Sequence, residues 1–227
     1  NYAEYSVQSK MVDSPESVID FLEKLVDLSH LQATTELKDL EAFAGHDLMP
    51  WDLMFYSEKL KQKVFNFKSA DLKPYFPESS VLSGLFETIQ NLYSVTLTEV
   101  EEDCYHPDVR VIMLEDEDGP IGKIYFDVYA RENKRGGAWM NECLGRRWMN
   151  SKLHLPVVHL VCNGTPPVGD TPSLMSFTEV ETLFHEFGHG LQGMLTTVDY
   201  AEVAGINGVE WDAVEIASQF MENWCYH

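Results

Sequence analysis

The stretch Phe184-His185-Glu186-Phe187-Gly188-His189 has the pattern H-E-x-x-H and lies where apolar residues recur with helical spacing. On an α-helix, His185 and His189 lie one turn apart on the same face, so their imidazoles can bind one metal ion. Zinc accepts such nitrogen ligands at about 2.0–2.1 Å. Glu186 is rotated by about 100° from His185 and can reach a water molecule held at the metal. The stretch therefore predicts a helix that carries a zinc site with a general base beside it.

The helix around this stretch has a start signal and an apolar side. Ser176 or Thr178 is expected to cap it, and Thr178 with Glu181 has capping-box spacing. Gly188 and Gly190 each cost about 1 kcal/mol of helix propensity, which close packing near a metal would offset. The apolar side is formed by Leu183, Phe184, Phe187 and Leu191.

Two histidines leave a catalytic zinc short of one ligand, because three protein ligands and one water are usual. The carboxylates that follow the helix are candidates for the third ligand: Glu202, Glu210, Asp212, Glu215 and Glu222. Spacing alone does not choose among them. Glu215 and Glu222 are seven residues apart and share one helical face. Glu215 could bind the metal while Glu222 holds the second nitrogen of a ligand histidine. The plainer alternatives are a histidine pair that is hydrogen-bonded in the core and a solvated Glu222.

The rest of the chain divides into segments of different character. Residues 1–95 are expected to be helical, residues 96–175 to form a small sheet with loops, and residues 176–227 to form the zinc-binding helices. No strong domain boundary is visible, so residues 1–227 are expected to form a single partial catalytic domain. The expected fold class is mainly α with a small β-sheet (α+β).

Residues typical of helix starts, helix ends and turns indicate the individual helices and strands. Helices are expected from Pro15, from Thr34 or Thr35 to Gly45, from Pro50, over about 79–93, and over about 211–224. Strands are expected at 109–114, 121–129 and 155–162. The last of these is expected at a sheet edge because a proline stands near its start. An extended peptide could then add to its free side.

The composition limits the possible partners. The formal net charge is −21, which repels nucleic-acid phosphates and anionic membranes, so neither is an expected partner. Hydrophobic residues make up 44% of the chain, enough for a substantial core. No apolar stretch approaches the roughly 18 residues of a membrane span. The four cysteines are scattered without a C-x-x-C pair, which argues against a thiolate metal site and favours a reducing compartment.

Motifs along almost the whole chain point to one family. They lie at residues 50–52, 75–77, 106–110, 129–132, 134–140, 184–191, 212–215 and 218–224. Together these segments are highly specific, and they closely resemble the thimet oligopeptidase family of zinc peptidases, nearest to its oligopeptidase A branch.

The resemblance implies roles for particular residues. His185 and His189 match the two histidine ligands, Glu215 matches the third ligand, and Glu186 matches the general base. It implies a zincin-like helical peptidase fold in which a deep channel admits short peptides and excludes folded proteins. It also implies an intracellular protein, in the cytoplasm or in an organelle (mitochondrion or chloroplast).

Departures from the family pattern lead to two further expectations. Gln192 stands where family members often have a further histidine that is not a ligand, so zinc binding is expected to survive. The family continues beyond the position of His227 with a glycine-rich loop and with tyrosine and histidine residues that help to stabilise the transition state. We therefore expect the chain to be a central portion of the catalytic region, with the zinc ligands but only half of the substrate channel.

The leading hypothesis is a zinc-dependent metalloendopeptidase with one Zn²⁺ per chain, short peptides as substrates and a monomeric state. The alternative is a non-catalytic peptide-binding fragment that retains a closed structural zinc site, in which an intact Glu186 would have no purpose. A third hypothesis is a metal hydrolase that acts on substrates other than peptides.

Overall fold

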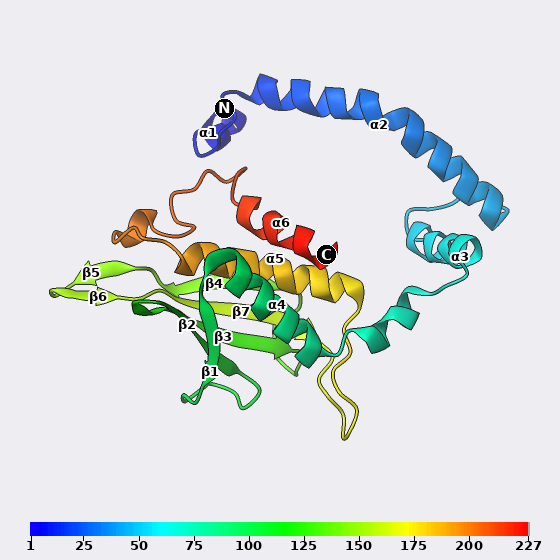
Figure 1. The fold of residues 1–227 in the computed structure, drawn as a ribbon. Coiled ribbons are helices and arrows are strands. Elements are labelled where there is room, and N and C mark those ends of the chain that lie inside the picture. Colours follow the sequence, from blue (N-terminus) through cyan, green and yellow to red (C-terminus); the bar gives the residue numbers. More distant parts are fainter. Residues whose placement is uncertain (227) are drawn as a thin grey trace. The chain divides into compact units, whose positions relative to one another are not determined.

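The computed structural model describes residues 1–226 as a mixture of α-helices and β-strands (Figure 1), which confirms the predicted α+β class. His227, the last residue of the predicted segment 176–227, lies outside the described residues. Contacts divide the chain into two compact units: Asn1–Leu72 with Glu210–Asp212, and Lys73–Val209 with Ala213–His227. Within residues 1–226, no helix combines the length and the apolar character needed to cross a membrane.

The first unit is helical, with α1 (Tyr2–Val7), α2 (Pro15–Ala44) and α3 (Leu53–Phe65), followed by the 3₁₀ helix η1 (Ser69–Tyr75). Ser14 caps α2, Pro15 occupies its first turn, and Gly45 ends it with φ +82°, as predicted. The prediction of a new helix at Thr34 or Thr35 is wrong, because α2 is continuous. Both hydroxyls donate to carbonyls one turn earlier within α2 instead of capping a new helix.

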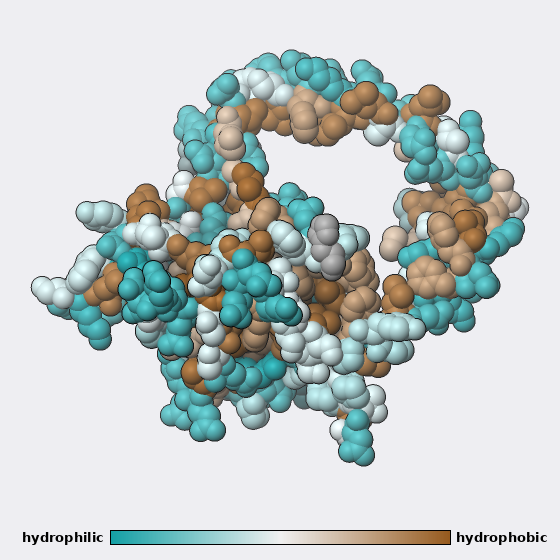
Figure 2. Space-filling model, in the orientation of Figure 1, coloured by the Kyte–Doolittle hydropathy of each residue, from teal (hydrophilic) through white to brown (hydrophobic). Residues whose placement is uncertain are grey.

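One side of α2 carries exposed apolar side chains, and Figure 2 shows hydrophobic residues gathered along this helix. Ile19, Leu22 and Val26 follow helical spacing, and each is more than half exposed, at 54%, 52% and 58%.

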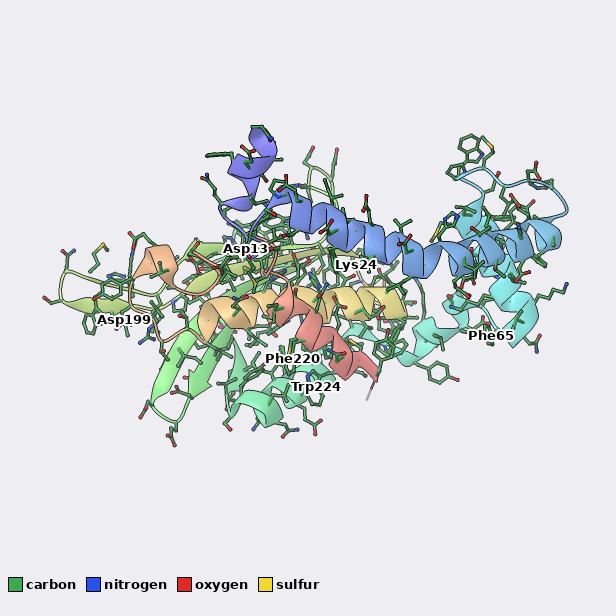
Figure 3. The ribbon with its side chains drawn as sticks, turned by 90° about the horizontal axis from the view of Figure 1, so that it is seen from above. Asp13, Lys24, Phe65, Asp199, Phe220 and Trp224 are labelled. Atoms are coloured by element: carbon green, nitrogen blue, oxygen red, sulfur yellow. The ribbon has the colours of Figure 1, made fainter. Side chains whose placement is uncertain are left out.

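The second unit contains a five-stranded sheet in the order β1-β2-β3-β7-β4. Its strands are β1 (Thr96–Val100), β2 (Arg110–Asp116), β3 (Gly119–Tyr129), β4 (Trp139–Leu144) and β7 (Val157–Gly164). β3 and β7 are parallel, whereas the other neighbouring pairs are antiparallel. A separate hairpin joins β5 (Arg147–Met149) to β6 (Lys152–His154). Asp199, labelled in Figure 3, holds this hairpin by accepting hydrogen bonds from Arg146 and from the Trp148 indole.

The predicted edge strand is an interior strand. β7 pairs with β3 on one side and with β4 on the other, so an incoming peptide cannot add to it. Pro156 directly precedes β7, and its carbonyl accepts a hydrogen bond from the Lys123 amide at 3.1 Å. The proline therefore leaves the β7 ladder intact, and it is β4 that ends the sheet.

Two helices cover one face of the sheet, α4 (Glu78–Tyr93) and α5 (Phe177–Met194). The Phe187 ring of α5 lies 6.1 Å from the Phe86 ring of α4 and 6.2 Å from the Phe126 ring of β3. Core side chains of β3, β7, α4 and α5 belong to a single apolar cluster. α5 is thus anchored on the sheet along its length.

α6 (Ile216–Glu222) runs beside α5 in both ribbon views, and Figure 3 labels Phe220 on α6 and Trp224 in the 3₁₀ helix η3 (Asn223–Tyr226). This helix begins later than predicted. Residues 211–215 form turns, because Asp212 accepts hydrogen bonds from the Met11 and Val12 amides instead of entering the helix.

Candidate metal and catalytic site

The capping box of α5 is formed by Ser176 and Glu179, two residues earlier than the predicted pair Thr178–Glu181. Ser176 Oγ accepts a hydrogen bond from the Glu179 amide, and the Glu179 carboxylate accepts one from the Ser176 amide at 2.6 Å. From this start, Leu183, Phe187 and Leu191 face the core and are at most 3% exposed. The histidines at i and i+4 consequently lie on the side of α5 that is turned away from the sheet.

Three predicted ligands converge at this side of α5. Glu215 Oε2 lies 3.1 Å from His185 Nε2 and 3.0 Å from His189 Nε2. The two imidazole rings are 5.0 Å apart and nearly perpendicular, at 84°. Among the described residues, these three form the one group of His, Cys, Asp or Glu side chains whose donor atoms all lie within 4.8 Å of one another.

The donor set fits a zinc ion. Bond lengths of about 2.0–2.1 Å and tetrahedral angles place two zinc ligands about 3.3 Å apart, and the two carboxylate–imidazole distances are close to that value. Burial lowers the pKa of His189, which favours the neutral imidazole that binds metals. Three protein ligands also leave a tetrahedral position open, as in catalytic zinc sites.

Two more side chains hold the candidate ligands in place. Glu222 Oε1 lies 2.6 Å from His185 Nδ1, so carboxylates from the two ends of α6 contact both nitrogens of one imidazole. Ser218, which is fully buried, donates to Glu215 Oε2 at 2.7 Å. Burial alone would raise the pKa of Glu215, but the Ser218 hydroxyl and the nearby histidines lower it overall. Glu215 is therefore held as a carboxylate facing the imidazoles.

Glu186 lies beside this group and is 7% exposed. Burial raises its pKa, as does the Glu215 charge, while His185 and a hydrogen bond from the Met140 amide of β4 act in the opposite direction. A pocket of about 430 Å³ opens here, and it is lined by Ala138, Thr178, Glu181, Thr182, His185, Glu186 and Glu222. A carboxylate with a raised pKa in a pocket next to candidate metal ligands is suited to taking up a proton.

The two glycines of α5 differ in their surroundings. A Cβ atom at Gly188 would lie 2.6 Å from both Ala217 O and Ser218 Cα, so this glycine permits the close approach of the segment that carries Glu215. A Cβ atom at Gly190 would meet its nearest neighbours at 3.8 Å, an ordinary contact. Close packing therefore explains Gly188 but not Gly190.

The other candidate ligands lie elsewhere. Glu202 and Glu210 are exposed and outside the converging group, and Asp212 is occupied by backbone amides. Sequence reasoning missed Ser218 and the Met140 amide. Ser218 had a usable signal, because it stands one helical turn after Glu215, but a backbone amide in a strand gives none.

Comparison with known proteins shows the family to which the sequence is similar. The family described as peptidase family M3 matches residues 1–227. Oligopeptidase A of Haemophilus influenzae is 48% identical over 99% of this chain and 34% of its own length, and that of Escherichia coli is 48% identical over 100% and 34%. An organellar oligopeptidase A of Arabidopsis thaliana, named chloroplastic/mitochondrial, is 45% identical over 100% of the chain and 30% of its own length. The chain thus spans about a third of the length of these relatives.

Proposed function

Because this chain belongs to peptidase family M3, we propose that it carries the metal centre of a zinc-dependent oligopeptidase that hydrolyses short peptides. The observation that supports this best is the convergence of donor atoms of His185, His189 and Glu215 within 4.8 Å, with Glu186 lining a pocket together with His185. In this proposal the first three side chains are the ligands of one zinc ion per chain. Glu186 is the general base, and Glu222 orients His185. The fold is of the zincin type.

In this proposal the three ligands and Glu186 have separate roles in peptide hydrolysis. A zinc ion bound by the three ligands would lower the pKa of a coordinated water and polarise a peptide carbonyl. Glu186 takes a proton from the attacking water and later delivers it to the leaving amine nitrogen. The raised pKa of Glu186 suits both steps, because the carboxyl group must gain and lose a proton near neutral pH.

The free edge of β4 offers a place for the peptide backbone. β4 pairs with β7 on one side, and no described strand pairs with its other side. The Met140 amide is close enough to Glu186 to lower the pKa of its carboxyl group, and Ala138 lines the pocket that contains Glu186 and His185. We propose that an extended peptide pairs with this edge, which would bring its scissile bond to the metal.

The proposal extends to substrates, oligomeric state and location. Short peptides are the substrates and the protein is monomeric. By analogy with the organellar name of the Arabidopsis thaliana relative, it works inside the cell, in the cytoplasm or in an organelle.

The test separates metal binding from catalysis. Glu186→Gln should keep one zinc per chain and lower the hydrolysis of a fluorogenic peptide by about 10²–10⁴-fold. Glu215→Ala should lose most of the zinc as well as the activity. Glu87→Gln, on the exposed side of α4, makes the same chemical change away from the site and should alter neither quantity.

Zinc content and turnover of the unsubstituted protein decide between the hypotheses. Near-normal turnover of Glu186→Gln would refute the assignment of the base. A protein that binds zinc and peptides without hydrolysing them would instead establish the non-catalytic peptide-binding alternative.

A further inference from the structure

The segment 130–138, which joins β3 to β4, contains two adjacent glycines just before the proposed substrate edge. Gly137 has φ +91°, a conformation that favours glycine, and Gly136 adds further backbone freedom. Ala138 follows directly and lines the pocket beside Glu186. The glycine pair therefore leaves the backbone before Ala138 flexible, and contacts with other residues must hold it in place.

Asn163 of β7 holds the glycine end of this segment. Its Nδ2 donates to Arg135 O at 2.8 Å and to Gly137 O at 2.7 Å. An amide nitrogen has two hydrogens, so both donors are used, and two carbonyl partners identify this end of the amide as the nitrogen.

The two hydrogen bonds of Asn163 lie where the backbone pairing between β4 and β7 has already ended, as the register of the sheet shows. Trp139 of β4 pairs with Val161 of β7, so two residues further along the antiparallel pair Gly137 stands opposite Asn163. Backbone pairing between β4 and β7 does not reach this position. The Asn163 side chain thus adds two hydrogen bonds to the segment that leads into β4, beyond the end of the backbone ladder.

A second anchor holds the other end of the segment. Lys134 Nζ donates to Asp127 Oδ1 at 2.9 Å and to Tyr129 O at 2.7 Å, and Arg131 forms a bidentate pair with Asp127. Asp127 is 2% exposed, so these ion pairs are shielded from water. Because this end is fixed on β3, the remaining backbone freedom lies at Gly136 and Gly137, where Asn163 donates its hydrogen bonds.

We propose that Asn163 is a positioning residue for peptide binding. By fixing Gly137 and Ala138, it sets the register and tilt of the free β4 edge relative to Glu186 and the ligand group. This inference rests on the proposed function, because it concerns the peptide that β4 would bind. Asn163 itself contacts none of the proposed metal ligands in the hydrogen-bond network of residues 1–226.

The experiment compares the binding of a peptide, which would pair with the β4 edge, with the binding of a small ligand that contacts the metal alone. Asn163→Asp keeps the side-chain shape but replaces both donors with a carboxylate facing two carbonyls. Asn91→Asp, at an exposed position of α4, adds the same charge elsewhere and is the control. Both are made in the zinc-loaded protein with Glu186→Gln, so that a fluorescein-labelled short peptide is bound without being cleaved. Acetohydroxamate serves as a probe of the metal alone.

We expect Asn163→Asp to weaken peptide binding by about 5–10-fold, as befits two partly solvated hydrogen bonds. Zinc content and acetohydroxamate affinity should stay within about twofold of the parent protein. Amide hydrogen exchange should become faster at residues 137–140 and remain unchanged in α5. Asn91→Asp should match the parent in every measurement.

Two results would overturn the inference alone: unchanged peptide affinity in Asn163→Asp, or a parallel loss of peptide, acetohydroxamate and zinc binding, which would show general damage to the fold. Failure of the proposed function is distinguishable, because the parent protein itself would then bind no zinc or no peptide.

Discussion

Gly188→Ala offers the sharpest test of how α5 and the segment before α6 build the ligand group. The added methyl group would lie 2.6 Å from Ala217 O and Ser218 Cα and 3.0 Å from Ala217 C. All three are backbone atoms, so no side-chain rotation can relieve the contact. The backbone that follows Glu215 must therefore move away from α5.

The structure sets the size of this movement. An ordinary contact begins at 3.4 Å, so the backbone must retreat by about 0.8 Å from its present 2.6 Å. Overpacking of this kind costs about 1–3 kcal/mol, whereas replacing a helical glycine with alanine returns about 1 kcal/mol. The expected net loss in the free energy of unfolding is about 0–2 kcal/mol. Metal sites tolerate about 0.2 Å in ligand distance, so we expect zinc affinity to fall at least tenfold.

Gly190→Ala is the matched control, two residues further along the same helix. Its methyl group would meet Met194 Cε and Val158 Cγ2 at 3.8 Å without strain. We expect unchanged zinc affinity and a gain of up to about 1 kcal/mol in stability. Urea unfolding and competition with a zinc-binding dye measure the two quantities. Equal zinc affinity in both variants would refute the reasoning, because it would mean that the close approach at Gly188 does not position Glu215.

Three further predictions follow from contacts described above. Glu222→Ala should reduce zinc affinity by about 10–100-fold in dye competition, because His185 loses the partner of its Nδ1; an unchanged affinity would remove Glu222 from the site. Burial of Asp127 opposes its ionisation, but Arg131, Lys134 and Tyr105 outweigh burial and lower its pKa from 3.8 to about 2. This contributes about 2 kcal/mol of stability that is present above pH 4 and lost as the pH falls towards 2; urea unfolding at several pH values should show that loss, and Asp127→Asn should abolish this part of the pH dependence. Glu179→Ala removes the capping box of α5 and should cost about 1 kcal/mol, visible as a lower thermal midpoint; an unaltered midpoint would contradict the assigned cap.

Local chemistry made much of the second unit predictable. The apolar spacing around Leu183 and Phe187 and the polar start at Ser176 specify α5, and strands at β2 and β3 are confirmed where β-branched residues cluster. The interior position of β7 was not predictable, because its pairing with β3 and β4 depends on segments distant in sequence, whereas a proline before a strand is compatible with either position.

The site shows the same division between local and distant information. The spacing of His185 and His189 predicts a shared face, but the choice of Glu215 depends on a backbone approach at Gly188 that no spacing rule contains. The proximity of the Met140 amide to Glu186 and the hydrogen bonds of Asn163 escaped prediction because each joins segments that are distant in sequence. The family resemblance singled out Glu215 as the candidate third ligand where residue spacing left five carboxylates open, and Glu215 is the one that lies within 4.8 Å of the two histidines.

One helix, α5, supplies both the centre of the apolar cluster and two of the proposed zinc ligands. An ion that binds only the native state adds RT ln(1 + [L]/Kd) to its stability, about 2.7 kcal/mol when its free concentration is a hundred times Kd. Cellular zinc supply would then govern the lifetime of the folded polypeptide as well as its catalytic competence. Under metal starvation, proteolytic turnover would remove idle molecules, so that abundance itself would follow zinc availability.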